Sequence, residues 1–451
     1  MTKKLTLKNK IFVGTMLFGM FFGAGNLIFP VYMGQQAGRN IWPAVIGFLI
    51  TGIGLPLLGV AAIGISRSDG VFDLAKKVGR PYAYFFTILL YLIIGPFFAL
   101  PRLATTSFQI GIEPFVPKGQ QTLVLAIFSV VFYLLAWWFC RKPSKIMMYI
   151  GKFLTPLFLI FLTIFVLVAL FKPMGGLDHS VQTGYQAAPL LSGFTEGYNT
   201  MDALAALAFG ITVVNVIRQL GVTDPAQIAK GTLSSGILSV ILMGIIYTLM
   251  TVVGTMSLAK FPVAANGGIV LAETANYYFH NLGSLFLAAI VILACLKTAI
   301  GLITSFGEAF SDLFPSWSYQ VIVVVASILP MIFANVGLTK IISYATPVLF
   351  FIYPLAMTLI ISGLLASALH ITNTWFYRLP VIFTIIPAIL DGLKNAPKVL
   401  TDHNFVQQLL HLRGLLPLAT YGLSWILPAV IAFVLGFIFC RRTNSKNEIK
   451  S

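Results

Sequence analysis

The sequence predicts an all-α polytopic membrane protein with about 12 transmembrane helices. Of its 451 residues, 58% are hydrophobic and only 9% are charged, whereas soluble domains carry roughly a quarter of charged residues. Its mean hydropathy is +0.93. Apolar stretches of about 20 residues recur from end to end, and each is long enough to cross a hydrocarbon core of roughly 30 Å.

These apolar stretches place the expected helices along the chain. They run over residues 11–33, 41–65, 82–112, 120–140, 146–171, 190–217, 230–257, 281–309, 318–336, 341–366, 376–393 and 420–440. Segments 68–77 and 265–279 are expected to form short helices at the membrane surface. Because no Ser- or Pro-rich linker divides the chain, we expect a single transmembrane domain over residues 1–451.

The basic charge of the chain is read as a signal of topology. There are 29 Lys and Arg against 13 Asp and Glu, but no basic patch alternates with aromatic residues, so no nucleic-acid partner is expected. With the N-terminus in the cytoplasm, 19 basic residues fall on the inner side and 8 on the outer side, which is the bias that orients membrane proteins. We therefore expect a multi-pass cell-membrane protein with both termini cytoplasmic. The first apolar run lacks a small-residue cleavage site, so it is expected to stay as a span.

Cysteines give no sign of a metal or disulfide framework. Cys140, Cys295 and Cys440 lie far apart and have no CxxC spacing, so free thiols are expected. No HExxH or GxSxG sequence occurs, which argues against an intramembrane enzyme.

The first span is predicted to be broken near its middle. Gly23, Ala24, Gly25 and Asn26 follow one another there, and Pro30 comes next. Each glycine costs about 1 kcal/mol relative to alanine inside a helix, and bare backbone at this depth is tolerated only where it lines a cavity or binds something. The alternative is close helix packing through small residues. Asn26 and Pro30 add nothing to such packing, which favours the break.

The sixth span repeats this anomaly over residues 197–202, which are polar and poor helix formers. An interrupted helix opening each half of a transporter indicates two inverted five-helix repeats with a binding site at the bilayer midplane. The repeats are expected at about 8–171 and 190–366, with appended helices at about 376–440. Half-helix N-termini attract an anionic group and unwound carbonyls attract a cation, which suits an amino acid zwitterion travelling with Na⁺ or H⁺.

Three motifs resemble a known family. They are FGMFFGAGNLIFP in the first span, GYNTMDALAALAFG in the sixth and CLKTAIGLITS in the eighth. Over essentially its whole length the chain resembles the bacterial branched-chain amino acid:cation symporter family. This resemblance implies the fold of the sodium-coupled leucine transporters and uptake of leucine, isoleucine and valine.

The resemblance also implies residue roles. The carbonyls of Gly19 and Phe22 would meet the hydroxyls of Thr304 and Ser305 at a sodium site, since hard oxygen ligands suit this ion. Such hydroxyls can equally bond back to their own helix. The side-chain oxygen of Asn26 could face a cation or brace the broken helix.

The two breaks are the expected substrate site, where the ammonium and carboxylate of the amino acid would bind. The candidates are Gly23, Ala24, Gly25, Asn26, Gly197, Tyr198, Asn199, Thr200 and Asp202. Tyr198 is the expected aromatic neighbour, although it could be structural. An apolar wall is expected from spans three, six, eight and ten.

Two charges near mid-membrane are unusual. Asp202 could receive the substrate ammonium, exchange the coupling proton or form a structural pair. Lys297 lies 12 residues from the inner end of span eight, about 18 Å, too deep for its side chain to reach water. It must be neutral, paired with an acid such as Asp202, or bonded to carbonyls as a tethered cation near the sodium position. Arg102, nearer the outer end of span three, could simply reach water.

Other functions remain as alternatives. A carrier of other small amino acids or zwitterions would share these features. A transporter-like amino acid sensor would usually carry a soluble signalling extension, and the tails here are short. The sequence is compatible with either Na⁺ or H⁺ as the coupling ion. It carries no sign of another cofactor and does not indicate an oligomeric state.

Overall fold

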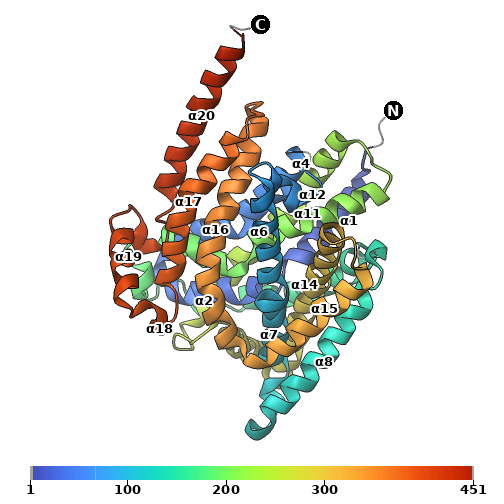
Figure 1. Ribbon diagram of the computed structural model, residues 1–451. Helices are drawn as coiled ribbons and strands as arrows, with labels where there is room; N and C mark the ends of the chain where they lie inside the picture. Colours follow the sequence, from blue (N-terminus) through green and yellow to red (C-terminus); the bar gives the residue numbers. More distant parts are fainter. Residues whose placement is uncertain (1–3, 67, 146, 449–451) are drawn as a thin grey trace.

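The computed structural model describes residues 4–66, 68–145 and 147–448, and all regular structure within these ranges is helical (Figure 1). The helices of the first half are α1 (Leu7–Phe21), α2 (Gly25–Ala37), α3 (Ile41–Leu49), α4 (Leu55–Ile65), α5 (Val71–Lys76), α6 (Arg80–Leu92), α7 (Ala99–Gly111), α8 (Gln121–Cys140) and α9 (Thr155–Phe171). Those of the second half are α10 (Pro189–Glu196), α11 (Asp202–Gln219), α12 (Pro225–Ser257), α13 (Gly267–Phe279), α14 (Gly283–Leu313), α15 (Tyr319–Phe333), α16 (Leu338–Ala368), α17 (Trp375–Lys394), α18 (Lys398–Thr401), α19 (Asn404–Gly414) and α20 (Ile426–Glu448).

Short 3₁₀ and π-helical turns connect or interrupt these helices. They are η1 (Gly38–Asn40), η2 (Ile50–Gly54), η3 (Ile93–Phe97), η4 (Glu113–Phe115), η5 (Lys118–Gln120), η6 (Pro143–Lys145), η7 (Met147–Leu154), η8 (Thr183–Tyr185), η9 (Gly197–Thr200), η10 (His280–Leu282), η11 (Ala334–Val336) and η12 (Ala419–Tyr421). Each predicted span therefore corresponds to a helical segment, and the predicted surface helices appear as α5 and α13.

By length and composition, ten stretches of the described helices could cross a membrane. One of them, Gly25–Ile65, joins the second half of the predicted first span to the whole second span. The last helix contributes a shorter apolar segment, Ile426–Cys440. With α1 preceding the break, these segments account for all the spans expected from the sequence.

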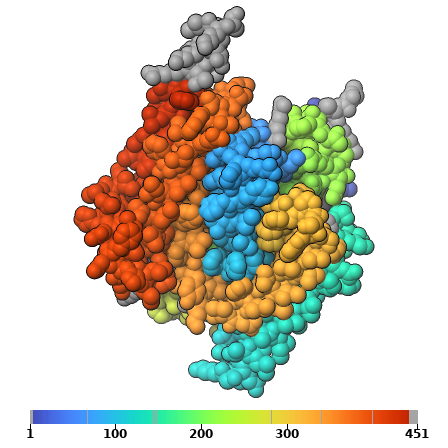
Figure 2. Space-filling view, in the orientation of Figure 1, coloured from blue at the N-terminus to red at the C-terminus, as the bar shows by residue number. Residues whose placement is uncertain are grey.

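Burial separates central helices from lipid-facing ones. In their most apolar stretches, α11 is 83% buried and α14 is 78% buried, against 28% for α8. Large apolar side chains such as Leu123, Ile127 and Trp138 are exposed along α8, as expected where the solvent is hydrocarbon. In the view of Figure 2, α8 projects at the lower edge and the C-terminal helices form one flank.

The two ends of the chain lie at one end of the molecule. In Figure 1 the N-terminal end of α1 and the C-terminal end of α20 are both in the upper part, whereas α8 reaches the bottom and α18 and α19 lie at the left edge. This is the arrangement expected for an even number of spans.

Three helix interruptions shape the interior. α1 ends at Phe21, and the N–H of Gly23 donates to Asn26 Oδ1 at 2.7 Å instead of extending the helix. In the sixth span Met201 has a left-handed backbone (φ 63°) between η9 and α11, a conformation that costs energy for a residue with a side chain. Span three, predicted as continuous, is also interrupted, because Gly95 within η3 has non-helical angles (φ −90°, ψ −120°) before Pro96.

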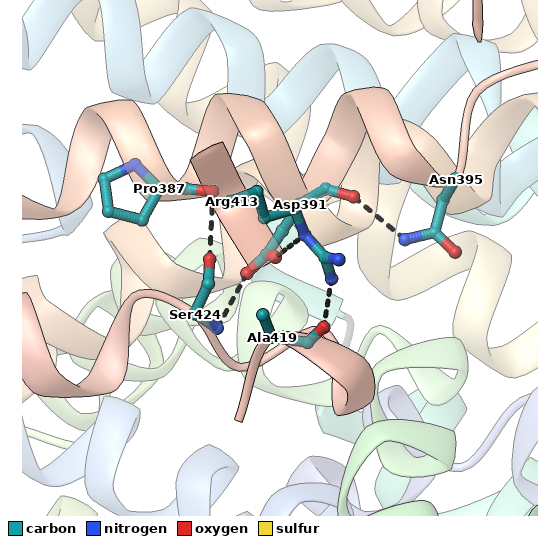
Figure 3. A network of polar contacts seen from close by, with 6 residues as sticks. All are labelled: Pro387, Asp391, Asn395, Arg413, Ala419 and Ser424. Atoms are coloured by element: carbon teal, nitrogen blue, oxygen red, sulfur yellow. Dashed lines mark hydrogen bonds and ion pairs between the residues drawn. The ribbon is translucent and has the colours of Figure 1, made fainter. Parts of the chain in front are cut away.

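A buried ion pair fixes the segment between α17 and α20 (Figure 3). Arg413 Nε donates to Asp391 Oδ1 at 2.7 Å, and the Ser424 N–H donates to Asp391 Oδ2 at 3.2 Å. The guanidinium also donates to the carbonyl of Ala419. α19 is thereby tied both to the end of α17 and to the chain that leads into α20.

Replacing Arg413 with methionine is expected to lower the free energy of unfolding by about 3–5 kcal/mol, because it leaves the Asp391 carboxylate buried without its partner. The matched control is Arg218→Met, which removes an exposed pair between Arg218 and Asp69 at 2.6 Å and should cost at most about 1 kcal/mol. Thermal melting in detergent measures both. Equal melting temperatures for the two variants would contradict a stabilising role for the buried pair.

Candidate functional site

A small cavity lies where the breaks of the first and sixth spans meet. Its volume of about 30 Å³ leaves room for about two water molecules, so the lining helices must separate to admit an amino acid. The lining residues are Phe21, Gly23, Ala24, Gly25, Asn26, Ile94, Ala99, Arg102, Leu103, Thr200, Met201, Asp202, Ala205, Thr298 and Leu302. The apolar members come from spans one, three, six and eight.

A hydrogen-bonded cluster forms one polar side of this cavity. Asn26 Nδ2 and the Tyr247 hydroxyl both donate to Asp202 Oδ2 at 2.6 Å. Asn26 also donates to the Tyr247 oxygen, and its own Oδ1 is occupied by the Gly23 N–H. Of the two roles considered for Asn26, the geometry is that of a brace for the broken helix. Thr200 contributes a further side-chain hydrogen bond to the same carboxylate.

Two helix N-termini also face this region. α2 begins at Gly25 and α11 begins at Asp202, next to the cavity. The first N–H groups of a helix have no partner within it and carry partial positive charge. They favour a carboxylate, either of a bound molecule or of Asp202 in the first turn of α11.

Lys297 lies outside the cavity lining, at the end of α1. Its ammonium donates to the carbonyls of Phe22 at 2.5 Å and Gly19 at 3.2 Å. These carbonyls lie at the C-terminal end of α1, where helical partners are missing and partial negative charge favours a cation. The rings of Phe18, Phe22 and Phe158 lie 5.4, 5.4 and 4.3 Å from the nitrogen, within the range of cation–π attraction.

The predicted sodium ligands are not brought together. Gly19 and Phe22 do present their carbonyls, but to Lys297 and, for Gly19, to the hydroxyl of Thr298 at 3.3 Å. Thr304 Oγ1 is buried without a partner among the described residues. Ser305 Oγ instead pairs with Thr212 Oγ1 at 2.7 Å. Thr304 lies two helical turns beyond Lys297, about 10 Å along α14, which explains why its hydroxyl does not share these carbonyls.

Lys297 and Asp202 do not form an ion pair. The ion pairs within the described chain are those of Arg218 with Asp69 and of Arg413 with Asp391. The geometry of Lys297 is therefore that of a side chain bonded to carbonyls rather than paired with an acid.

The second break differs from its prediction in detail. Thr200 and Asp202 line the cavity, whereas Gly197, Tyr198 and Asn199 are absent from its lining. Tyr198 is buried and stacks on Tyr353 at 4.4 Å between ring centroids, which is the structural role.

Arg102 is the main residue of the cavity that was not among the predicted site residues. It lines the cavity and is only 5% exposed, so it does not reach water at the outer surface. Its guanidinium donates to the carbonyls of Asn199 at 2.7 Å and Thr200 at 3.4 Å. The signal available in the sequence was an arginine within an apolar span, which is costly unless the side chain is paired or functional.

Comparison with known proteins shows the family of this chain. The sequence matches the family described as branched-chain amino acid transport protein over residues 6–443. It is 45% identical over 439 residues to the branched-chain amino acid permease BrnQ of Lactobacillus delbrueckii subsp. lactis, covering 96% of this chain and 97% of that protein. It is 39% identical to the branched-chain amino acid permease BrnQ of Bacillus subtilis (strain 168), over 97% and 98% of the two chains.

Solved structures show the fold. The chain is similar to Mhp1, a nucleobase-cation-symport-1 family transporter in a closed conformation, with a TM-score of 0.56 at 14% identity, covering 97% of this chain and 93% of that one. MhsT in complex with L-phenylalanine gives a TM-score of 0.51 at 15% identity, covering 97% and 99%. Both have the leucine-transporter fold, so the predicted inverted five-helix repeat with broken first and sixth helices is confirmed. The similar sequences are named as permeases, so the chain is a transporter and not an enzyme. On this evidence it belongs to the branched-chain amino acid transport protein family.

Proposed function

We propose that this protein carries leucine, isoleucine and valine into the cell by cation-coupled symport. It would lie in the plasma membrane with both termini in the cytoplasm, and the boundaries of its two repeats would be those expected from the sequence, about 8–171 and 190–366. The observation that carries the proposal is the cavity between the two breaks. It combines the carboxylate of Asp202 and the N-terminus of α2 with apolar walls from several spans.

The site suits a branched-chain zwitterion at each of its parts. The substrate ammonium would bind Asp202 Oδ1, and the substrate carboxylate would bind at residues 23–26. Leu103 and Leu302 offer apolar surface for the branched side chain, whose burial favours binding by about 0.8 kcal/mol for each CH₂ group.

Lys297 supports the proton as the coupling ion. Its ammonium already occupies the carbonyls of Gly19 and Phe22, so Na⁺ could reach them only by displacing a charge of the same sign. Loss of one proton from Lys297 would remove this charge and weaken the link between α14 and the end of α1. If the proton is released to the cytoplasmic side and regained from the outer side, the link is restored and one proton moves inward with each cycle.

Counterflow in proteoliposomes tests the transport function. Vesicles loaded with unlabelled leucine should take up labelled leucine, and external isoleucine or valine should compete while alanine and phenylalanine compete weakly. Empty vesicles are the control. Absence of counterflow would contradict transport, and equal competition by all four amino acids would favour a carrier of broader specificity.

A further inference from the structure

The two breaks are capped in the same way by basic residues on related helices. Lys297, on the third span of the second repeat, bonds the carbonyl end of the break in span one. Arg102, on the third span of the first repeat, bonds the carbonyl end of the break in span six. An inverted repeat relates these two spans, so Arg102 and Lys297 hold corresponding places in the two halves.

The two positions differ in what surrounds the cation. Lys297 is enclosed by three aromatic rings and does not line the cavity, whereas Arg102 does. A β-carbon built on Gly25 would lie 3.1 Å from Arg102 Nη2, so the guanidinium is next to the N-terminus of α2. Arg102 Nε is buried and has no hydrogen-bond partner among the described residues.

The residue types also differ in chemistry. A lysine amine can lose its proton, but a guanidinium stays charged and presents several donors in a planar fork that matches a carboxylate. Arginine is therefore unsuited to releasing a coupling proton and well suited to holding an anion. The free Nε–H, the adjacent α2 N-terminus and the opposing Asp202 together define an orientation for a zwitterion.

We propose that Arg102 recognises the α-carboxylate of the transported amino acid, together with the N-terminus of α2, and so selects substrates that carry this group. The inference rests on the proposed transport function and adds a specificity-determining residue to it. Arg102 keeps its bonds to Asn199 and Thr200, so binding of the carboxylate also connects α2 to the break in span six.

Competition binding to the purified full-length protein tests this role, with labelled leucine as the probe. The competitors are leucine and leucinol, which retains the ammonium and the branched side chain but lacks the carboxylate. The wild type should prefer leucine. Arg102→Met should weaken leucine binding by about 10- to 100-fold, the range expected for lost charge-assisted hydrogen bonds, and leave leucinol binding unchanged. Arg39→Met, which removes an exposed arginine, should alter neither.

The outcomes separate recognition from bracing. If Arg102 only braced the break, Arg102→Met would weaken the binding of leucine and of leucinol by the same factor, and the proposal would be overturned. The comparison of leucine with leucinol in the wild type needs no variant, and equal affinities there would also overturn it. Arg102→Lys, which keeps the charge, should retain part of the preference for leucine and covers the case in which Arg102→Met does not fold. Failure of the transport function itself would appear separately, as wild-type protein that gives no leucine counterflow.

Discussion

Replacing Gly25 with leucine is expected to abolish leucine uptake while the protein still reaches the membrane. A β-carbon at this position would already lie 3.1 Å from Arg102 Nη2 and 3.3 Å from the ring of Phe29. The remaining atoms of a leucine side chain must displace the guanidinium or occupy the cavity, and leucine also favours a continuous helix through the break. Uptake of labelled leucine in whole cells, normalised to the amount of protein in the membrane, measures the effect.

A graded series keeps this result interpretable. Gly25→Ala adds only the β-carbon and should raise the KM for leucine while retaining measurable transport. Gly119→Leu is the matched control, because no atom lies within 4 Å of a β-carbon built there. If Gly25→Leu transported at the wild-type rate, the first break could not be part of the substrate site.

Replacing Lys297 with methionine is expected to give a protein that exchanges leucine across the membrane but no longer concentrates it. Methionine can fill the space among the rings of Phe18, Phe22 and Phe158, but it carries no proton. The carbonyl of Phe22 loses its donor, at about 1–3 kcal/mol for a buried group left unpaired, whereas Gly19 keeps the hydroxyl of Thr298, so some loss of thermal stability is also expected. Counterflow and gradient-driven accumulation, measured in the same proteoliposomes, separate exchange from coupling.

Two further variants distinguish this role from a structural one. Lys260→Met, in the exposed segment after α12, should leave both assays unchanged. If Lys297 and Asp202 acted as a structural pair, Lys297→Met would fold poorly and Asp202→Asn would partly rescue it. Since these residues form no ion pair, we expect no rescue. Normal accumulation by Lys297→Met would remove this residue from the coupling mechanism.

The broken helices were predictable because their cause is local. The first span contains glycines beside Asn26, and the sixth contains a polar run that ends at Asp202. Both depart from the usual composition of a membrane helix, whatever the packing around them. The depth of Lys297 was likewise a matter of counting residues along one helix. The hydrogen-bond partners of Lys297 could not be predicted in this way, because they lie at the end of α1, some 275 residues earlier.

Side-chain partners across helices depend on packing that one sequence does not reveal. Tyr247 shares the carboxylate oxygen of Asp202 with Asn26, yet no motif surrounds it. From the sequence Arg102 could have reached water, but its guanidinium donates to the carbonyls of Asn199 and Thr200 in the second break. The interruption of span three at Gly95, which precedes it, was not anticipated.

The sodium-site prediction shows a different limit. The sodium-coupled leucine transporters have a pair of hydroxyl ligands at their sodium site, and the prediction assigned this pair to Thr304 and Ser305 from the matching motif alone. In the structure the amine of Lys297, two turns before Thr304 on the same helix, bonds the carbonyls of Gly19 and Phe22, and Thr298 supplies the hydroxyl at Gly19. The exposed carbonyls of Gly19 and Phe22 follow from the break itself, whereas the groups that the facing helix presents to them depend on packing, and the sodium role of Thr304 and Ser305 stays a prediction.

Gradient-driven uptake by the purified wild-type protein tests the coupling account most directly. Proteoliposomes are given an inward proton gradient or an inward sodium gradient, one at a time and with the membrane potential clamped, and the accumulation of labelled leucine is measured. If Lys297 carries the coupling proton, leucine accumulates with the proton gradient in the absence of sodium, and the sodium gradient alone gives only equilibration. Accumulation driven by sodium at equal pH on both sides would contradict the account.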